Sequence, residues 1–171
     1  MFKKSIIEFV SKFTKFPVVP DRFKFGLVTF SFDAEVKFHQ DTYTDNATLL
    51  DAIDNVASSI DCDGASNAHA AFDVIGDVLF CETRGERKDV GKVIILFSDG
   101  LFSNPVSAEI KARTLKRDFY ASVYCVATGQ NILHRELLGV ASAPSHVSSI
   151  HEDNWMYRIL QGTMFDCDGT A

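Results

Sequence analysis

The stretch KVIILFSDG, residues 92–100, decides the fold class of this 171-residue chain. Five consecutive apolar residues that favour β-strands occupy its middle, between Gly91 and the pair Asp99-Gly100. A half-exposed strand alternates apolar and polar residues, whereas a strand covered on both faces is a continuous apolar run. The stretch therefore predicts a central parallel strand over 92–97, and parallel strands require crossover connections, which are usually helices.

Helical and strand patterns alternate on both sides of this stretch. We expect strands over 23–32, 35–39, 121–127 and 146–150, and helices over 2–13, 49–60, 66–80, 105–117, 133–138 and 154–161. The turn at Asp33-Ala34 joins the first two strands, which predicts an antiparallel hairpin. Thr44, Asp45 and Asn46 are candidate caps of the helix over 49–60. The pattern predicts one α/β domain with a doubly wound, mostly parallel sheet and one antiparallel edge hairpin.

Composition and charge exclude several classes of protein. Hydrophobic residues make up 46% of the chain, which is enough for a sizeable core, yet no apolar stretch approaches the ~20 residues that span a bilayer. Lys and Arg number 17 against 23 Asp and Glu, which gives a net charge of −6. This balance, without a dense basic cluster, argues against binding to nucleic acid or to an anionic membrane. We therefore expect a soluble globular domain.

Two loops at the expected strand ends carry groups that could bind a ligand, since sites in open α/β sheets lie beyond the carboxyl ends of the strands. Asp99 could present a carboxylate to a hard cation, or it could cap the following segment while Gly100 makes a turn. Ser66 offers a hydroxyl, and the alternative role for it is to cap the helix that follows. Leu101 and Phe102 would add apolar contact area for a partner if exposed, or else pack back on the core.

Motifs of catalysis and nucleotide binding are missing from the sequence. It contains no GxGxxG after a strand, no GxxxxGK[ST] and no GxSxG. The five histidines lack the paired spacing of a metal cluster, and Asp61 and Asp63 lack the further ligands of an EF-hand loop. An α/β enzyme, such as a hydrolase or a phosphoryl-transfer domain, would need a nucleophile with its base or a phosphate loop. We therefore expect no enzymatic activity.

The four cysteines show no CxxC pair. A helix over 66–80 would be about 22 Å long and would separate Cys62 from Cys81, whereas a disulfide needs Cα atoms within roughly 7 Å. Cys125 lies in an apolar run and is interpreted as a buried free thiol. Cys167 follows the last expected helix and could pair with a cysteine outside this chain.

An ordered set of segments resembles the von Willebrand factor type A domain, also called the integrin I-like domain. Residues 25–31 (FGLVTFS) resemble its second strand, residues 64–80 its G-G-T-x-T helix, and residues 93–100 (VIILFSDG) its fourth strand. Residues 124–129 and 136–142 match later patterns of the family. The resemblance implies a Rossmann-like architecture over residues 1–162, followed by a C-terminal tail over 163–171.

The family often binds a divalent cation at a metal-ion-dependent adhesion site. The resemblance places Ser66 at the position of its ligand threonine and Asp99 at that of its ligand aspartate. The D-x-S-x-S loop, which follows the family's first strand, has no counterpart, because the chain opens inside the helix that comes next. We therefore expect an N-terminally incomplete domain that lacks the first strand. Either the chain is a truncated fragment or the product of an alternative start, or the sheet of this domain closes in a different way. Mg²⁺ or Mn²⁺ would bind in an intact parent domain, and weakly or not at all in this chain.

The resemblance also implies a function, that of a non-enzymatic protein-binding or adhesion module. The expected setting is an extracellular matrix or cell-surface protein, secreted as part of a larger chain. The expected partner is a matrix or cell-surface protein, collagen-like ligands included, which contacts Asp99, Leu101 and Phe102. The alternative is an intracellular domain of the same fold that acts as a metal-independent scaffold in a larger assembly. Unpaired thiols would favour this alternative, and a bridge from Cys167 to an upstream cysteine would favour the extracellular setting.

Overall fold

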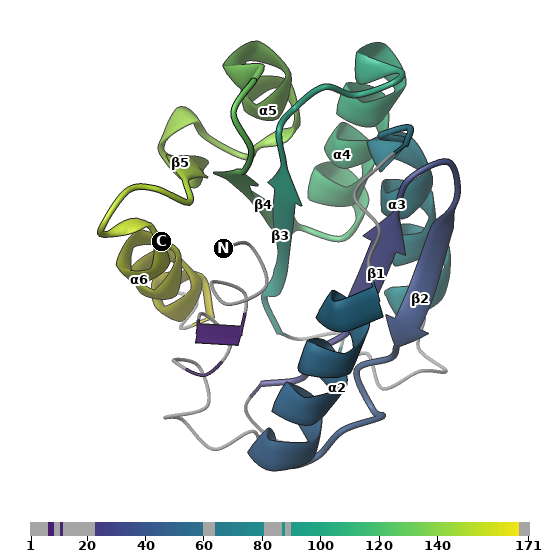
Figure 1. Ribbon diagram of the computed structural model, residues 1–171, viewed down its shortest axis with the longest axis vertical. Coiled ribbons are helices and arrows are strands. Elements are labelled where there is room, and N and C mark those ends of the chain that lie inside the picture. Colours follow the sequence, from purple (N-terminus) through teal and green to yellow (C-terminus); the bar gives the residue numbers. More distant parts are fainter. Residues whose placement is uncertain are drawn as a thin grey trace.

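The computed structural model describes residues 7–8, 11, 23–59, 64–80, 87 and 90–167, with side chains as far as residue 162. Helices and strands alternate along this part of the chain (Figure 1). The strands are β1 (Leu27–Phe30), β2 (Ala34–Phe38), β3 (Lys92–Ser98), β4 (Ala121–Ala127) and β5 (Val147–Ser149). The helices are α2 (Asn46–Ser59), α3 (Ala68–Val74), the π-helical turn η1 (Ile75–Leu79), α4 (Pro105–Asp118), α5 (His134–Val140), the 3₁₀ turn η3 (Pro144–His146) and α6 (Trp155–Cys167). The α/β fold class is confirmed.

The described strands form two sheets. One is parallel in the order β3-β4-β5, and the other is the antiparallel pair β1-β2, which confirms the expected hairpin. Among the described strands of the parallel sheet, β4 has a strand on each side while β3 stands first in the order, so for these strands the expectation that residues 92–97 form the central one is wrong. The continuous apolar run of β3 indicates that both faces of the strand are covered by other elements. It does not indicate which strands pair with β3 within the sheet.

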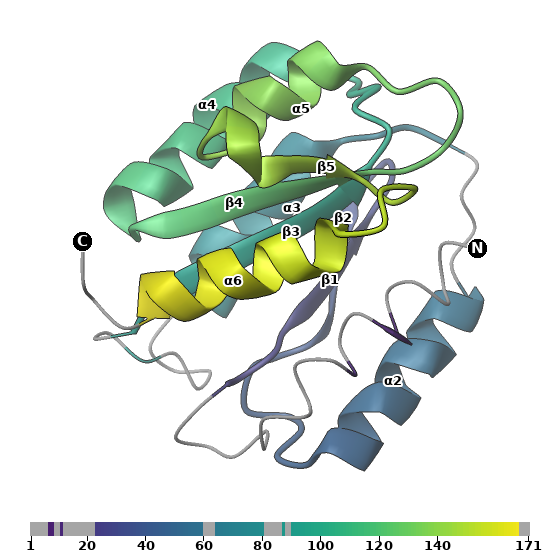
Figure 2. The ribbon, with the colours of Figure 1, turned by 90° about the vertical axis from the view of Figure 1, so that its left-hand side faces the viewer.

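Both faces of the parallel sheet are covered by helices (Figure 2). Figure 2 places α4 and α5 on one side of β3 and β4, and α6 on the other. Successive side chains of β4 point to opposite faces, so Val123 and Cys125 pack with α3, α4 and α5, whereas Tyr124 and Val126 pack with α2 and α6. The hydrophobic core is therefore double, with a cluster on each face of the sheet.

The start of α2 is fixed by a side-chain cap. The N–H of Thr48 donates to Oδ1 of Asp45 at 3.0 Å, and the Thr48 hydroxyl donates to Oδ2 of the same carboxylate at 2.5 Å. These hydrogen bonds hold the pKa of Asp45 below its usual value. Of the three candidate caps, Asp45 is thus the one that caps the helix.

Several element boundaries differ from those expected. β1 covers only Leu27–Phe30 of the expected 23–32, because its pairing with β2 begins at Leu27↔Phe38. Gly139 lies inside α5 rather than ending the helix. α6 extends to Cys167 instead of residue 161 and so contains Gly162, where an added Cβ would lie 2.2 Å from the phenol oxygen of Tyr124. Cys167 therefore ends a helix, and the division of the chain at residue 162 stays a prediction.

Some expectations concern residues outside the described part of the chain. Of the helix expected over 2–13, only Ile7, Glu8 and Ser11 are described, and they are helical. Cys62 and Cys81 lie outside the described residues. Cys125 is a buried free thiol, as predicted. Within the described residues, none of the helices combines the length and the apolar character that crossing a bilayer requires.

Candidate functional site

The loop that leaves β3 holds Asp99 in a sharp turn. Gly100 has a φ of +80°, and an added Cβ would lie 2.6 Å from the carbonyl oxygen of Leu133. Oδ1 of Asp99 accepts the N–H of Leu101 at 3.0 Å, and the buried hydroxyl of Ser98 accepts the N–H of Gly100 at 3.1 Å. The carboxylate therefore supports its own turn, and Gly100 meets the conformation that the turn requires. We name residues 99–103 the Asp99 loop.

The first turn of α5 clamps this loop from one side. The N–H of Leu133 donates to the carbonyl oxygen of Asp99 at 2.7 Å, and Oε2 of Glu136 accepts the N–H of Phe102 at 3.0 Å. Sequence reasoning missed Glu136, because it lies 34 residues from its partner and nothing in the local pattern points to such a contact. Glu136 positions the Asp99 loop through the backbone of Phe102.

Removing the Glu136 carboxylate is expected to loosen the Asp99 loop without unfolding the domain. In Glu136→Ala, the Phe102 amide keeps only its bond to the carbonyl oxygen of Gly100, at 2.9 Å. A hydrogen bond to a charged group stabilises by about 1.5–3 kcal/mol, so hydrogen exchange at this amide should accelerate about tenfold or more. Glu136→Gln keeps an acceptor oxygen and should exchange within a few-fold of the parent. Equal exchange at Phe102 in the parent and in Glu136→Ala would contradict the clamp.

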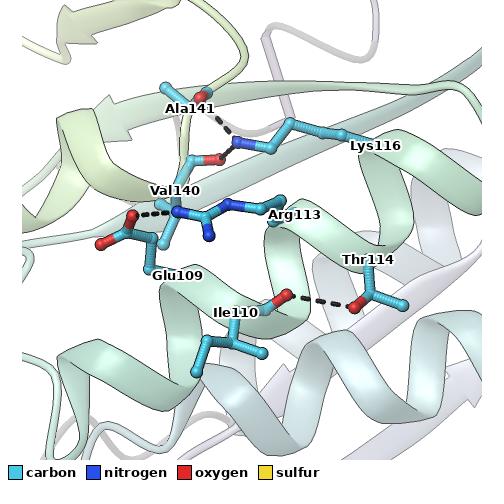
Figure 3. A network of polar contacts seen from close by, with 7 residues as sticks. All are labelled: Glu109, Ile110, Arg113, Thr114, Lys116, Val140 and Ala141. Atoms are coloured by element: carbon cyan, nitrogen blue, oxygen red, sulfur yellow. Dashed lines mark hydrogen bonds and ion pairs between the residues drawn. The ribbon is translucent and has the colours of Figure 1, made fainter.

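The last turn of α5 is fastened to α4 (Figure 3). The Lys116 ammonium donates to the carbonyl oxygens of Val140 and Ala141 at 3.0 and 2.9 Å, which satisfies two acceptors at the helix end. Burial holds the pKa of Lys116 below its usual value. Figure 3 also shows the ion pair between Arg113 and Glu109, 2.7 Å, on the neighbouring turn of α4. The helix that clamps the Asp99 loop is thus itself held at its far end.

A second loop, which precedes α3, is tied to the Asp99 loop by two hydrogen bonds. The N–H of Ser66 donates to Oγ of Ser103, and the N–H of Ser103 donates to the carbonyl oxygen of Ser66, both at 3.0 Å. The capping residue of α3 is Asn67 rather than Ser66, and its side chain caps nothing, because Nδ2 donates to the carbonyl oxygen of Phe32 at 2.7 Å. The Asn67 N–H donates to the carbonyl oxygen of Ser31 at 2.9 Å. These contacts join the tip of the β1-β2 hairpin to both loops.

The structure therefore brings the loops of Ser66 and Asp99 together, as expected for the strand ends. Leu101 is 49% exposed, whereas Phe102 is 7% exposed and packs in the core cluster with Ala108 and Leu137. Of the two alternatives for Phe102, the one observed is that it packs back on the core, where residues of α4 and α5 surround its ring; an exposed Phe102 that contacts a partner is not observed. Phe32, at the hairpin tip, is 74% exposed and was not singled out from the sequence.

The side chains of these loops do not by themselves fit a tightly held divalent cation. No three His, Cys, Asp or Glu side chains gather as a metal group anywhere in the described part of the chain. Ser66 and Asp99 supply few oxygens against the six that Mg²⁺ prefers, and Oδ1 of Asp99 already accepts a hydrogen bond. Among the described side chains, Ser66 and Asp99 thus supply at most part of a cation site.

The buried thiol of Cys125 lacks the properties of a catalytic nucleophile. Burial raises its pKa to about 12, and Sγ lies 3.6 Å from the carbonyl oxygen of Leu137, to which the thiol donates. The thiolate is the reactive form of cysteine, so Cys125 is inert near neutral pH. Its place beneath α5 makes it part of the packing that supports the Asp99 loop.

Comparison with known proteins identifies the fold independently. A model of the von Willebrand factor type A domain matches residues 1–161. Von Willebrand factor A domain-containing protein 1 of Mus musculus is 29% identical over 152 residues, which are 86% of this chain and 35% of that protein. The transmembrane cell adhesion receptor mua-3 of Caenorhabditis elegans is 24% identical over 149 residues, 85% of this chain and 4% of the receptor.

A solved structure is also similar to this chain in its fold. Proximal thread matrix protein 1 from the mussel byssus, with a zinc-occupied metal-ion-dependent adhesion site motif, has a TM-score of 0.79 at 23% identity. The match covers 94% of this chain and 39% of that one. This chain thus spans about a third or less of the length of the two protein relatives that it matches.

Proposed function

We propose that this chain, which belongs to the von Willebrand factor type A domain family, is a non-enzymatic module that binds a protein ligand through the Asp99 loop. Domains of this family are typically protein-binding or adhesion modules. The observation that carries the proposal is the construction of the loop: an exposed Leu101 beside Asp99, held by hydrogen bonds from α5 and from the loop before α3. A pre-formed surface loses little conformational entropy when it binds.

The proposed setting is extracellular, in a matrix or cell-surface protein, and collagen-like ligands belong to the expected partners. Two relatives support it through their names, one a transmembrane cell adhesion receptor and the other a thread matrix protein. Cys125 offers no catalytic nucleophile, because burial raises the pKa of its thiol to about 12. Mg²⁺ or Mn²⁺ would contribute weakly, through Ser66 and Asp99, because the described side chains leave most of the coordination to water.

Binding to immobilised matrix proteins, collagens included, tests the proposal. Asp99→Ala and Leu101→Ser should each weaken binding at least tenfold, or about 1.4 kcal/mol, because they remove the polar and the apolar contact of the loop. Asp118→Ala is the matched control, since it removes an exposed carboxylate that pairs with Arg117 at the end of α4. It should bind as the parent does.

Two outcomes would contradict the proposed function. One is that no matrix or cell-surface protein binds the chain better than an unrelated domain. The other is that Asp99→Ala and Leu101→Ser bind as tightly as Asp118→Ala while all three unfold at the same temperature. Adding Mn²⁺ in place of a chelator should change the affinity of the chain only slightly, and a large gain would mean that the cation site is more complete than proposed.

A further inference from the structure

The beginning of α2 carries a sequence motif that the binding function does not use. Residues 46–48 read Asn46-Ala47-Thr48, an Asn-x-Thr acceptor for N-linked glycosylation whose middle residue is not proline. The other asparagines of the chain stand in different contexts: none has Ser or Thr two positions later without an intervening proline. The chain therefore offers one acceptor for such a sugar.

We propose that Asn46 carries an N-linked glycan, an inference that rests on the extracellular setting of the proposed function. Asn46 is the first residue of α2 and is partly exposed, and its neighbours Asp45, Ala47 and Thr48 are exposed. The first buried residue of the helix is Leu49, one turn later. Side chains of a helix tilt toward its N-terminus, so a sugar on Nδ2 of Asn46 is directed past the end of the helix.

The hydrogen bonds at the start of α2 determine whether the sugar is added before or after this helix folds. In the folded chain the Thr48 hydroxyl donates to Asp45, and the Thr48 N–H is bonded to the same carboxylate. The hydroxyl and the N–H of Thr48 are thus both hydrogen-bonded once the helix has formed. Transfer of the sugar must therefore precede the folding of α2, as it does for a chain still entering the secretory pathway.

The chemistry is a substitution at the first sugar carbon of a lipid-linked oligosaccharide diphosphate. The Nδ2–C1 bond forms, and the bond between C1 and the diphosphate oxygen breaks, with its electron pair leaving on the lipid diphosphate. Nδ2 releases one proton, which passes to the solvent. No oxidation or reduction takes place. Thr48 stays unmodified and is needed only for recognition of the acceptor.

The position of the sugar is compatible with ligand binding. Figure 1 shows the start of α2 at the lower end of the molecule, whereas the connection from β3 to α4, which contains the Asp99 loop, lies at the upper end. A glycan on Asn46 would therefore leave the Asp99 loop open. It would add a solvated, bulky group beside the exposed cap of α2.

The test expresses the full chain behind a secretion signal in eukaryotic cells and measures its mass before and after peptide N-glycosidase, in medium and in cell lysate. The parent chain should lose the mass of one glycan, and Thr48→Ser, which keeps the acceptor hydroxyl, should do the same. Asn46→Gln and Thr48→Val should show no loss. Asn55→Gln is the matched control on the same helix and should remain glycosylated.

An unglycosylated parent chain in both fractions would overturn the inference, and so would a glycan that survives Asn46→Gln. Folded chain purified without a sugar should not be an acceptor in detergent-opened microsomes, whereas the urea-unfolded chain diluted into them should be. Matrix binding separates the two proposals. A glycosylated chain that binds no matrix protein defeats the proposed function alone, and an unglycosylated chain that binds through Asp99 defeats the glycan alone.

Discussion

Replacing Gly100 by alanine is expected to lower the free energy of unfolding by about 3 kcal/mol. Gly100 has a φ of +80°, which L-residues rarely adopt, and the added Cβ would lie 2.6 Å from the carbonyl oxygen of Leu133 and 3.0 Å from Cγ of Leu137. Leu137 is fully buried, so neither neighbour can move away freely. The loss should appear as a lower urea midpoint with an unchanged slope.

The matched control is Gly139→Ala, on the helix that clamps the same loop. Its Cβ would have ordinary contact, 3.5 Å, with Oε2 of Glu109, and alanine favours the helix by up to about 1 kcal/mol. This variant should therefore be as stable as the parent or slightly more so. If both alanine variants unfold at the same urea concentration, Gly100 does not require its left-handed conformation.

Replacing Phe72 by alanine is expected to have an even larger effect, a loss of about 3–5 kcal/mol. Phe72 is 2% exposed and is the largest of the fully buried side chains among the described residues. It lies on α3 in the cluster that contains Ile94 and Leu96 of β3 and that packs against Phe30 of β1. The cavity would therefore open where the two sheets meet a common helix. Since domains are stable by about 5–15 kcal/mol, thermal unfolding should shift well below that of the parent.

Phe32→Ala removes the same side chain from an exposed position. Phe32 is 74% exposed at the hairpin tip, so the change should leave the free energy of unfolding within about 0.5 kcal/mol of the parent. Comparable losses in Phe72→Ala and Phe32→Ala would contradict the assignment of Phe72 to the core. Comparing these two variants thus separates the effect of burial on stability from the effect of removing a phenylalanine side chain.

The fold class followed from periodicity because helices and strands of this chain differ clearly in the spacing of apolar residues. Asp45 could be identified as a candidate cap because its contact with Thr48 spans three residues. The order of strands could not be obtained in this way, since an apolar run such as β3 reports coverage of its faces only. The length of α6 was missed because a glycine suggests the end of a helix, whereas at Gly162 the space for a Cβ is taken by Tyr124, which is remote in sequence.

For the candidate site too, local sequence patterns could be predicted, whereas contacts between residues distant in sequence could not. Asp99 and Gly100 were found because a turn after an apolar strand is a local pattern, and the loop of Ser66 was found because it precedes a helix. The contacts that hold these loops, from Glu136 and from Ser103, span 34 and 37 residues and leave no local trace. The inward direction of Phe102 depends on the packing of α4 and α5, which the sequence pattern does not specify. Whether Ser66 and Asp99 bind a cation stays a prediction.

The paired hydrogen bonds between Ser66 and Ser103 have a mechanical consequence. A ligand that pulls on the Asp99 loop would also load the segment before α3, and through Asn67 it would load the tip of the β1-β2 hairpin. On the other side, Leu133 and Glu136 transfer part of the force to α5, which Lys116 anchors to α4. Tension applied at one loop is thereby shared by several elements in parallel, so that no single hydrogen bond bears it alone.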